Sequence, residues 1–70
     1  MDKKELGYVI KTRRKALKID QQTLALLAGV GINTVVAVER GDGNPKISTI
    51  LSLLDTMGLQ IKVILKDLDL

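Results

Sequence analysis

The sequence contains no cysteine and no histidine, and its single aromatic side chain is Tyr8. The absence of cysteine excludes a disulfide framework and a thiolate zinc site. Without histidine, the chain has neither the commonest general base nor the commonest metal ligand. Its eight carboxylates show no spacing that suggests a paired acid–base site. We therefore expect no enzymatic activity and no cofactor.

Long apolar runs are also missing. None approaches the roughly 18 residues that a membrane-spanning helix needs. The N-terminus is charged at Asp2, Lys3, Lys4 and Glu5, and no apolar signal-peptide segment follows it. These observations predict a cytoplasmic protein with no membrane partner.

Aliphatic side chains, by contrast, are abundant. Hydrophobic residues make up 46% of the 70 residues, so we expect one domain with a core of leucine, isoleucine, valine and alanine. A domain this short buries only about 60% of the surface of its unfolded chain. Dimerisation is a common way to bury more surface, and we expect a homodimer.

The net charge of +3 is unevenly distributed along the chain. Residues 1–18 carry seven basic and two acidic side chains, whereas residues 19–45 carry one basic and three acidic ones. A basic first segment can neutralise DNA phosphates, which drives much of non-specific DNA affinity. The alternative is a basic face that only keeps the protein soluble.

Hydrophobic periodicity and capping residues predict four helices, over residues 3–17, 21–28, 32–40 and 47–57. Asp2 and Asp20 are suitable N-caps, and Gly29 is a suitable C-cap. Residues 42–45, Asp-Gly-Asn-Pro, form the strongest helix-breaking segment of the chain. The predicted fold class is all-α, with four helices.

The C-terminal segment has a different period. Leu59, Ile61, Val63 and Leu65 occupy alternate positions, which predicts a short β-strand. A single strand in a helical chain lacks a partner, and the simplest partner is the same strand of a second copy. The alternative is a frayed or helical extension. The predicted organisation is a domain at residues 1–58, followed by a dimerisation strand and tail at residues 59–70.

The second and third predicted helices are short, and a turn of three residues joins them. This arrangement, over about residues 20–40, is typical of a helix-turn-helix, whose second helix presents its first residues to the DNA major groove. The side chains expected to pack the motif inwards are Leu24, Ala25, Val30, Val35 and Val38.

The same segment resembles the lambda-repressor/Cro-type (XRE-like) helix-turn-helix family over about residues 5–58. The matching residues are Ile19-Asp20-Gln21-Gln22-Thr23-Leu24-Ala25, Ala28-Gly29-Val30, Thr34-Val35, Val38-Glu39-Arg40-Gly41 and Asn44-Pro45. The resemblance implies a four-helix repressor-type DNA-binding domain. It also implies a sequence-specific transcriptional repressor that binds a palindromic operator in double-stranded DNA as a dimer.

A narrower resemblance concerns the end of the chain. Residues 54–59, Leu-Asp-Thr-Met-Gly-Leu, followed by the predicted strand, are similar to HipB-like antitoxins. This resemblance implies a dimer sealed by the tail strands, repression of the protein's own operon and a kinase-like toxin as partner. Two alternatives stay open. One is a free-standing phage-like or restriction-control repressor, and the other is a protein-interaction module with a degenerate DNA-reading face.

The family resemblance also implies roles for polar residues of the motif. Gln21 corresponds to a glutamine that touches a phosphate, at a helix N-terminus that favours anions in any case. Asn33 and Thr34 correspond to residues that face bases or backbone, and an asparagine amide can pair with adenine. Arg14 and Glu39 are expected to form a structural ion pair between the first and third helices.

The loop after the third helix is expected to hold phosphate. Arg40 and Lys46 are the expected cationic ligands, Asn44 is a further candidate, and Asp42 is not a phosphate ligand because it is an anion. The alternative for these loop residues is an ordinary solvated loop.

Several apolar residues depart from the family pattern. Gly31 stands where the family usually has a serine or threonine cap, and Leu26 lies on the expected outer face of the second helix. Ile32, Val36 and Ala37 occupy positions that are usually polar and face the groove. Apolar groups there can contact thymine methyl groups, or they can mark a surface that meets protein instead.

Overall fold

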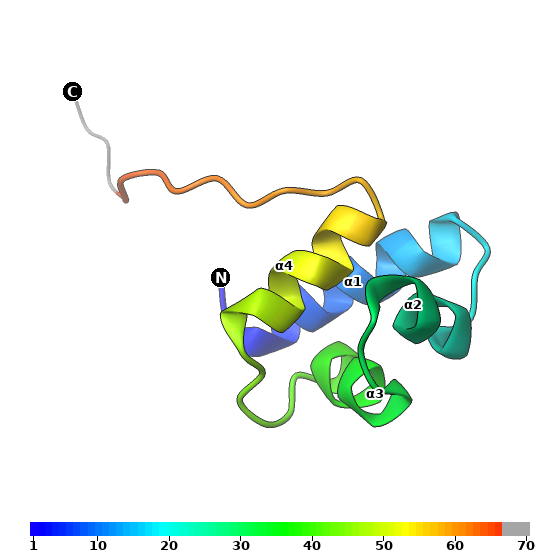
Figure 1. Ribbon diagram of the computed structural model, residues 1–70. Coiled ribbons are helices and arrows are strands. Elements are labelled where there is room, and N and C mark those ends of the chain that lie inside the picture. Colours follow the sequence, from blue (N-terminus) through cyan, green and yellow to red (C-terminus); the bar gives the residue numbers. More distant parts are fainter. Residues whose placement is uncertain (67–70) are drawn as a thin grey trace.

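The computed structural model describes residues 1–66 of the chain. This part contains four helices in the predicted order (Figure 1). The helices are α1 (Lys3–Ala16), α2 (Gln21–Ala28), α3 (Ile32–Arg40) and α4 (Ile47–Thr56). The predicted bounds of α2 and α3 are confirmed, while α1 and α4 each end one residue earlier than expected. Residues 67–70, the end of the predicted tail, lie outside the described residues.

Aspartates cap the first two helices, as predicted. The Asp2 side chain accepts a hydrogen bond of 2.8 Å from the Glu5 backbone N–H. Asp20 accepts one of 2.7 Å from the Thr23 N–H, and this bond lowers the pKa of the Asp20 carboxyl below its ordinary value of 3.8. The two short-range bonds therefore set where the chain enters α1 and α2.

The end of α1 is unusual because a lysine takes the place of a glycine. Lys18 has a φ of 59°, in the left-handed region, and its N–H donates to the Lys15 carbonyl at 3.0 Å. A left-handed residue that carries a Cβ is costly, and helices that end in this conformation usually place glycine there. Gly29, at the end of α2, has this geometry without the cost, with a φ of 71°.

All four helices contribute to one apolar core. Ile10 of α1, Leu24 of α2, Val35 of α3 and Leu53 of α4 are fully buried. Around them lie five more buried hydrophobic side chains, Ala25, Val38, Ile50, Leu54 and Met57. Each helix therefore stabilises the fold mainly through one apolar face.

Two leucines do not lie where the hydrophobic periodicity places them. Helical spacing places Leu17 on the same face of the first helix as Leu6 and Ile10, and Leu51 on the same face of the fourth as Ile50 and Leu54, but the two leucines are 40% and 46% exposed, so this expectation is wrong. Leu17 lies one residue beyond the last turn of α1 and caps it instead. On α4 the core takes Ile50, Leu53 and Leu54, and the neighbouring Leu51 therefore points away from it.

Helices α1 and α3 approach each other closely at Gly7. A Cβ placed on Gly7 would overlap the Val38 carbonyl oxygen and lie 2.8 Å from the Glu39 carbonyl oxygen. Both obstacles are backbone atoms, which cannot swing aside as a side chain can. The close contact holds the third helix against the first.

Helix α4 is joined to the rest of the domain by side chains that bind free carbonyls at helix ends. The Ser52 hydroxyl donates to the Ala28 carbonyl at 2.7 Å. The Arg13 Nε donates to the Met57 carbonyl at 2.9 Å. These bonds satisfy C-terminal carbonyls of α2 and α4, which have no partner inside their own helices.

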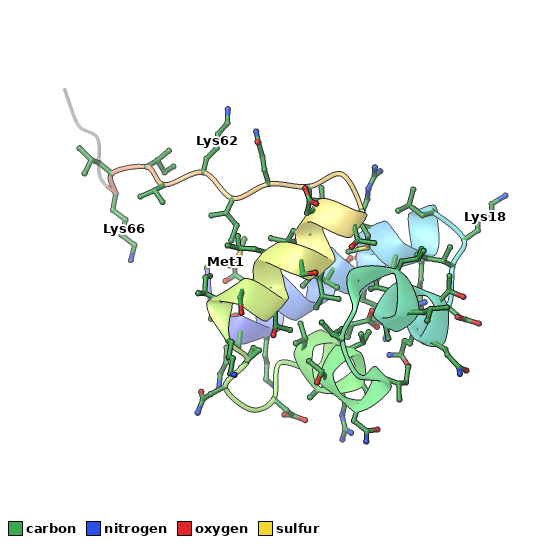
Figure 2. All side chains as sticks on the ribbon, in the orientation of Figure 1. Met1, Lys18, Lys62 and Lys66 are labelled. Carbon is green, nitrogen blue, oxygen red and sulfur yellow. The ribbon has the colours of Figure 1, made fainter. Side chains whose placement is uncertain are left out.

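The tail, residues 59–66, continues beyond α4 in an open conformation (Figure 1). Leu59 packs against the core, but Val63 is 95% exposed and Ile64 and Leu65 are also largely exposed. In Figure 2, Lys62 and Lys66 project from the tail into open space. None of the described residues forms a strand, because this segment has no partner strand within a single chain. The predicted strand between two copies stays a prediction.

Within residues 1–66, no single helix is both long and apolar enough to cross a membrane. Helices α2 and α3 pass the same test only when they are taken together as a bent pair, by length and composition.

Candidate nucleic-acid interface

Helices α2 and α3 form a sharply bent pair around a short turn. Their axes differ by 114°, within the range typical of a helix-turn-helix. Gly29 ends α2 in the left-handed conformation, and Gly31 precedes α3 without a side-chain cap, as predicted. Leu24, Val35 and Val38 are buried below the turn. The packing of the motif therefore agrees with the prediction.

The exposed side of α3 adjoins the loop that follows it. Asn33, Thr34 and Ala37 line a shallow hollow of about 290 Å³, together with Val38 and loop residues 42–45. Asn33 is exposed, while Thr34 and Ala37 are half-buried. The structure therefore brings together four of the predicted contact residues, Asn33, Thr34, Ala37 and Asn44.

The other predicted contact residues lie outside this hollow. Ile32 is exposed at the start of α3, and Val36 is half-buried on the same helix. Arg40 and Lys46 are exposed on either side of the loop. They border the hollow in sequence but do not line it.

Gln21 is the predicted contact residue whose placement is least expected. Its side-chain N–H donates to Glu39 Oε1 at 3.0 Å, and the residue is half-buried. The amide is thus bound to α3 within the domain. One of its two N–H hydrogens makes this bond, and the other is left for a second acceptor.

A bidentate ion pair joins α1 to α3, as predicted. Arg14 Nε lies 2.7 Å from Glu39 Oε2, and the second guanidinium nitrogen lies 3.1 Å from Oε1. A third bond of 2.8 Å runs from Arg14 to the Ile19 carbonyl. The Glu39 hydrogen bond raises the pKa of the buried Arg14 guanidinium, so Arg14 is bound inside the domain as a cation.

Arg40 also has a carboxylate neighbour, which the sequence did not predict. Its Nε lies 3.5 Å from Asp42 Oδ2, and both side chains are largely exposed. An exposed pair of this kind contributes little to stability. It does place a negative charge beside one of the predicted phosphate ligands.

The outer face of α2 is more apolar than predicted. Leu26 is 80% exposed, as its position suggested, and Leu27 is 64% exposed beside it. Only Leu26 was expected there from the sequence. The run Leu-Ala-Leu-Leu contains more apolar residues than one buried helical face can take.

No cluster of three metal-ligating side chains is found within residues 1–66.

Comparison with known proteins agrees with the helical geometry. A family model described as helix-turn-helix matches residues 10–64, more than half of the chain. The chain belongs to the helix-turn-helix family. The matched family model describes the XRE type of helix-turn-helix, which is the type that the motif residues resemble.

Two helix-turn-helix relatives align with most of this chain. One is the uncharacterized HTH-type transcriptional regulator y4mF of Sinorhizobium fredii, 32% identical over 60 residues, which cover 86% of this chain and 79% of that protein. The other is an uncharacterized HTH-type transcriptional regulator of Haemophilus influenzae, 34% identical over 53 residues. That alignment covers 76% of this chain but 54% of the relative, so the chain spans about half its length. Helix-turn-helix membership indicates DNA-binding regulation of transcription.

Proposed function

We propose that this helix-turn-helix protein is a sequence-specific repressor that binds a palindromic operator as a dimer. The observation that carries the proposal is the hollow in which Asn33 and Thr34 of α3 adjoin the loop at residues 42–45. Side chains at the start of the second motif helix reach base edges, while the neighbouring loop holds the DNA backbone. One surface of the domain thus combines both kinds of contact.

The contacts divide by chemistry. The Asn33 amide is suited to adenine, and the exposed Ile32 is suited to a thymine methyl group. Arg40 and Lys46 bind phosphates, and Asn44 supplies an amide to the backbone. Val36 and Ala37 are half-buried, so they contribute apolar contact at the edge of this surface. The remaining N–H of Gln21 faces a phosphate at the start of α2.

The tail supports the dimer in this proposal. Its apolar side chains Val63, Ile64 and Leu65 are 95%, 79% and 75% exposed, and Ile61 is 47% exposed. Leu59, Gln60 and Ile61 also line a groove of about 480 Å³ with Leu6 and Val9 of α1 and Leu54 of α4. Pairing two tails as antiparallel strands hydrogen-bonds one edge of each tail and brings apolar side chains of the two tails side by side.

The antitoxin role forms the narrower part of the proposal. It rests on the similarity of residues 54–66 to HipB-like antitoxins, and it adds repression of the protein's own operon and a kinase-like toxin partner. A free-standing repressor has the same DNA surface. Co-purification of a kinase-like protein encoded by the adjacent gene supports the antitoxin role, and its absence favours the free-standing repressor.

The direct test is binding to the DNA upstream of the protein's own gene, measured by fluorescence anisotropy at low salt. We expect saturable binding that weakens steeply as salt rises. Asn33→Ala should reduce the preference for that DNA over a scrambled duplex, because an amide–adenine contact is worth about 1–3 kcal/mol of discrimination. Thr12→Ala, at an exposed position of α1, is the control. No binding at low salt contradicts the proposal.

A protein-interaction module is the second candidate function. The exposed Leu26 and Leu27 favour it, because they form an apolar surface on the outer face of α2. Under this alternative, Leu26→Lys abolishes partner binding, and wild-type protein does not bind the upstream DNA. Under the repressor proposal, Leu26→Lys leaves operator affinity unchanged or increases it through the added charge.

A further inference from the structure

We propose that the first turn of α1 is part of the same DNA interface, and that Lys3 and Lys4 bind phosphates beside the loop at residues 42–45. The inference rests on the proposed DNA-binding function and adds two residues to it. Neither lysine belongs to the motif, and 40 positions separate Lys3 from its loop partner. Only the folded structure places them together.

Lys3 reaches the loop directly. Its Nζ donates a hydrogen bond of 2.8 Å to the Gly43 carbonyl, and Gly43 lines the hollow that contains Asn33 and Thr34. An ammonium group has three N–H donors, and this bond uses one of them. The charge of Lys3 therefore lies at the rim of the base-reading surface, with donors left for a phosphate oxygen.

Lys4 is adjacent to the end of α3. A Cβ placed on Gly41 would lie 2.8 Å from Lys4 Cγ and 3.0 Å from Lys4 Cα. The first turn of α1 therefore packs directly against Gly41, the residue that ends α3. Lys4 is nevertheless an exposed residue, and its side chain leaves α1 beside Gly41, the residue that precedes the loop.

The charge balance explains why these lysines matter. Because Glu39 is buried against Arg14, the exposed charges of residues 19–45 are Asp20, Asp42 and one cation, Arg40, which lies 3.5 Å from Asp42. A surface with this balance repels phosphate unless cations come from elsewhere in the chain. Lys3 and Lys4 supply two positive charges to the same loop.

Other lysines of α1 provide matched controls. Lys11 and Lys15 are exposed on the same helix, where they line a separate shallow surface with Tyr8 and Thr12. That surface includes no residue of α3 or of the loop. Substituting Lys11 or Lys15 changes the net charge by the same amount without touching the proposed interface.

The experiment measures the affinity of the full chain for the upstream DNA over a range of salt concentrations. The variants are Lys3→Gln, Lys4→Gln, Lys11→Gln and Lys15→Gln, each confirmed as folded by circular dichroism. We expect Lys3→Gln and Lys4→Gln to reduce the slope of log affinity against log salt by about 0.9 for each phosphate that the variant no longer neutralises. Lys11→Gln and Lys15→Gln should leave that slope unchanged, and Lys3→Arg should retain the wild-type slope.

The outcomes separate this inference from the proposed function. If wild-type protein binds and all four glutamine variants change the slope equally, the lysines act only through net charge and the inference is wrong. The same conclusion follows if Lys3→Gln and Lys4→Gln change nothing. If wild-type protein does not bind DNA even at low salt, the proposed function itself fails, and the inference fails with it.

Discussion

The helical body and the C-terminal tail differ in how completely their side chains are buried and hydrogen-bonded within a single chain. Within residues 1–66, every buried side-chain nitrogen and oxygen has a hydrogen-bond partner, and the core draws on all four helices. The tail begins with Leu59 packed on that core, but Val63 four residues later is 95% exposed. The body thus buries its apolar side chains within one chain, whereas the described part of the tail leaves most of its apolar side chains exposed. Stability and assembly should therefore be separable by substitution.

The largest expected effect is on assembly. We expect the full chain to sediment as a dimer and a chain that ends at Gln60 to sediment as a monomer, because the apolar tail side chains are then absent. The body of the shortened chain should keep its helical content, since the core residues all precede residue 60. Sedimentation velocity with circular dichroism makes the measurement. A shortened chain that remains a dimer disproves the strand-pairing proposal.

The next largest effect is expected inside the body, at the ion pair between α1 and α3. Glu39→Gln should lower the free energy of unfolding by about 3 kcal/mol, because it leaves the buried Arg14 guanidinium without its counter-charge. The Glu39 side chain is only 2% exposed. Glu5→Gln, an equal charge change at an exposed site of α1, should have little effect. Urea unfolding of both variants checks the difference, and equal effects would count against a structural role for the pair.

A smaller effect of opposite sign is expected at Lys18. Lys18→Gly should raise the free energy of unfolding by about 0.5–1 kcal/mol, because glycine adopts the left-handed conformation without a Cβ penalty but loses more entropy on folding. Lys18→Ala removes the same charge and keeps the Cβ, so it is the matched control. Thermal unfolding should rank Lys18→Gly above both Lys18→Ala and wild type. If Lys18→Gly is no more stable than Lys18→Ala, the backbone explanation is wrong.

The smallest expected effect is a dependence on acid pH at Asp20. Its pKa is lowered in the folded protein by the hydrogen bond from the Thr23 N–H, so the ionised carboxyl stabilises the native state. That contribution is complete above the ordinary value of 3.8 and is lost as the pH falls below it through the folded-state pKa. Asp20→Asn keeps a capping oxygen that does not titrate, so its stability should fall less steeply in acid. Parallel pH profiles would contradict this assignment.

The same comparison shows what could be predicted from the sequence. The bounds of α2 and α3 follow from local chemistry, since Asp20, Gly29 and Gly41 act within a few residues of the helix ends they define. The Arg14–Glu39 pair could be predicted from the family resemblance. Leu17 and Leu51 could not be placed correctly, because a chain so rich in leucine offers more apolar positions than its core accepts.

Contacts between distant residues of the site were not predictable. Gln21 binds Glu39 across 18 positions, and Lys3 binds Gly43 across 40. Nothing in the local pattern of either segment specifies these pairs, which depend on how α1 and α2 pack against α3. The polar surface around the loop is therefore a property of the folded body rather than of the motif alone.

The most direct test of the proposed interface is a nuclear magnetic resonance titration of the isotope-labelled full chain with its upstream DNA. We expect the largest amide shift changes at residues 32–34 and 41–46, with further changes at Lys3 and Lys4. The amide shifts of Leu26, Leu27 and the tail should change little, apart from the general line broadening of a larger complex. Changes centred on Leu26 and Leu27, or no changes at all, would contradict DNA recognition by α3 and its following loop.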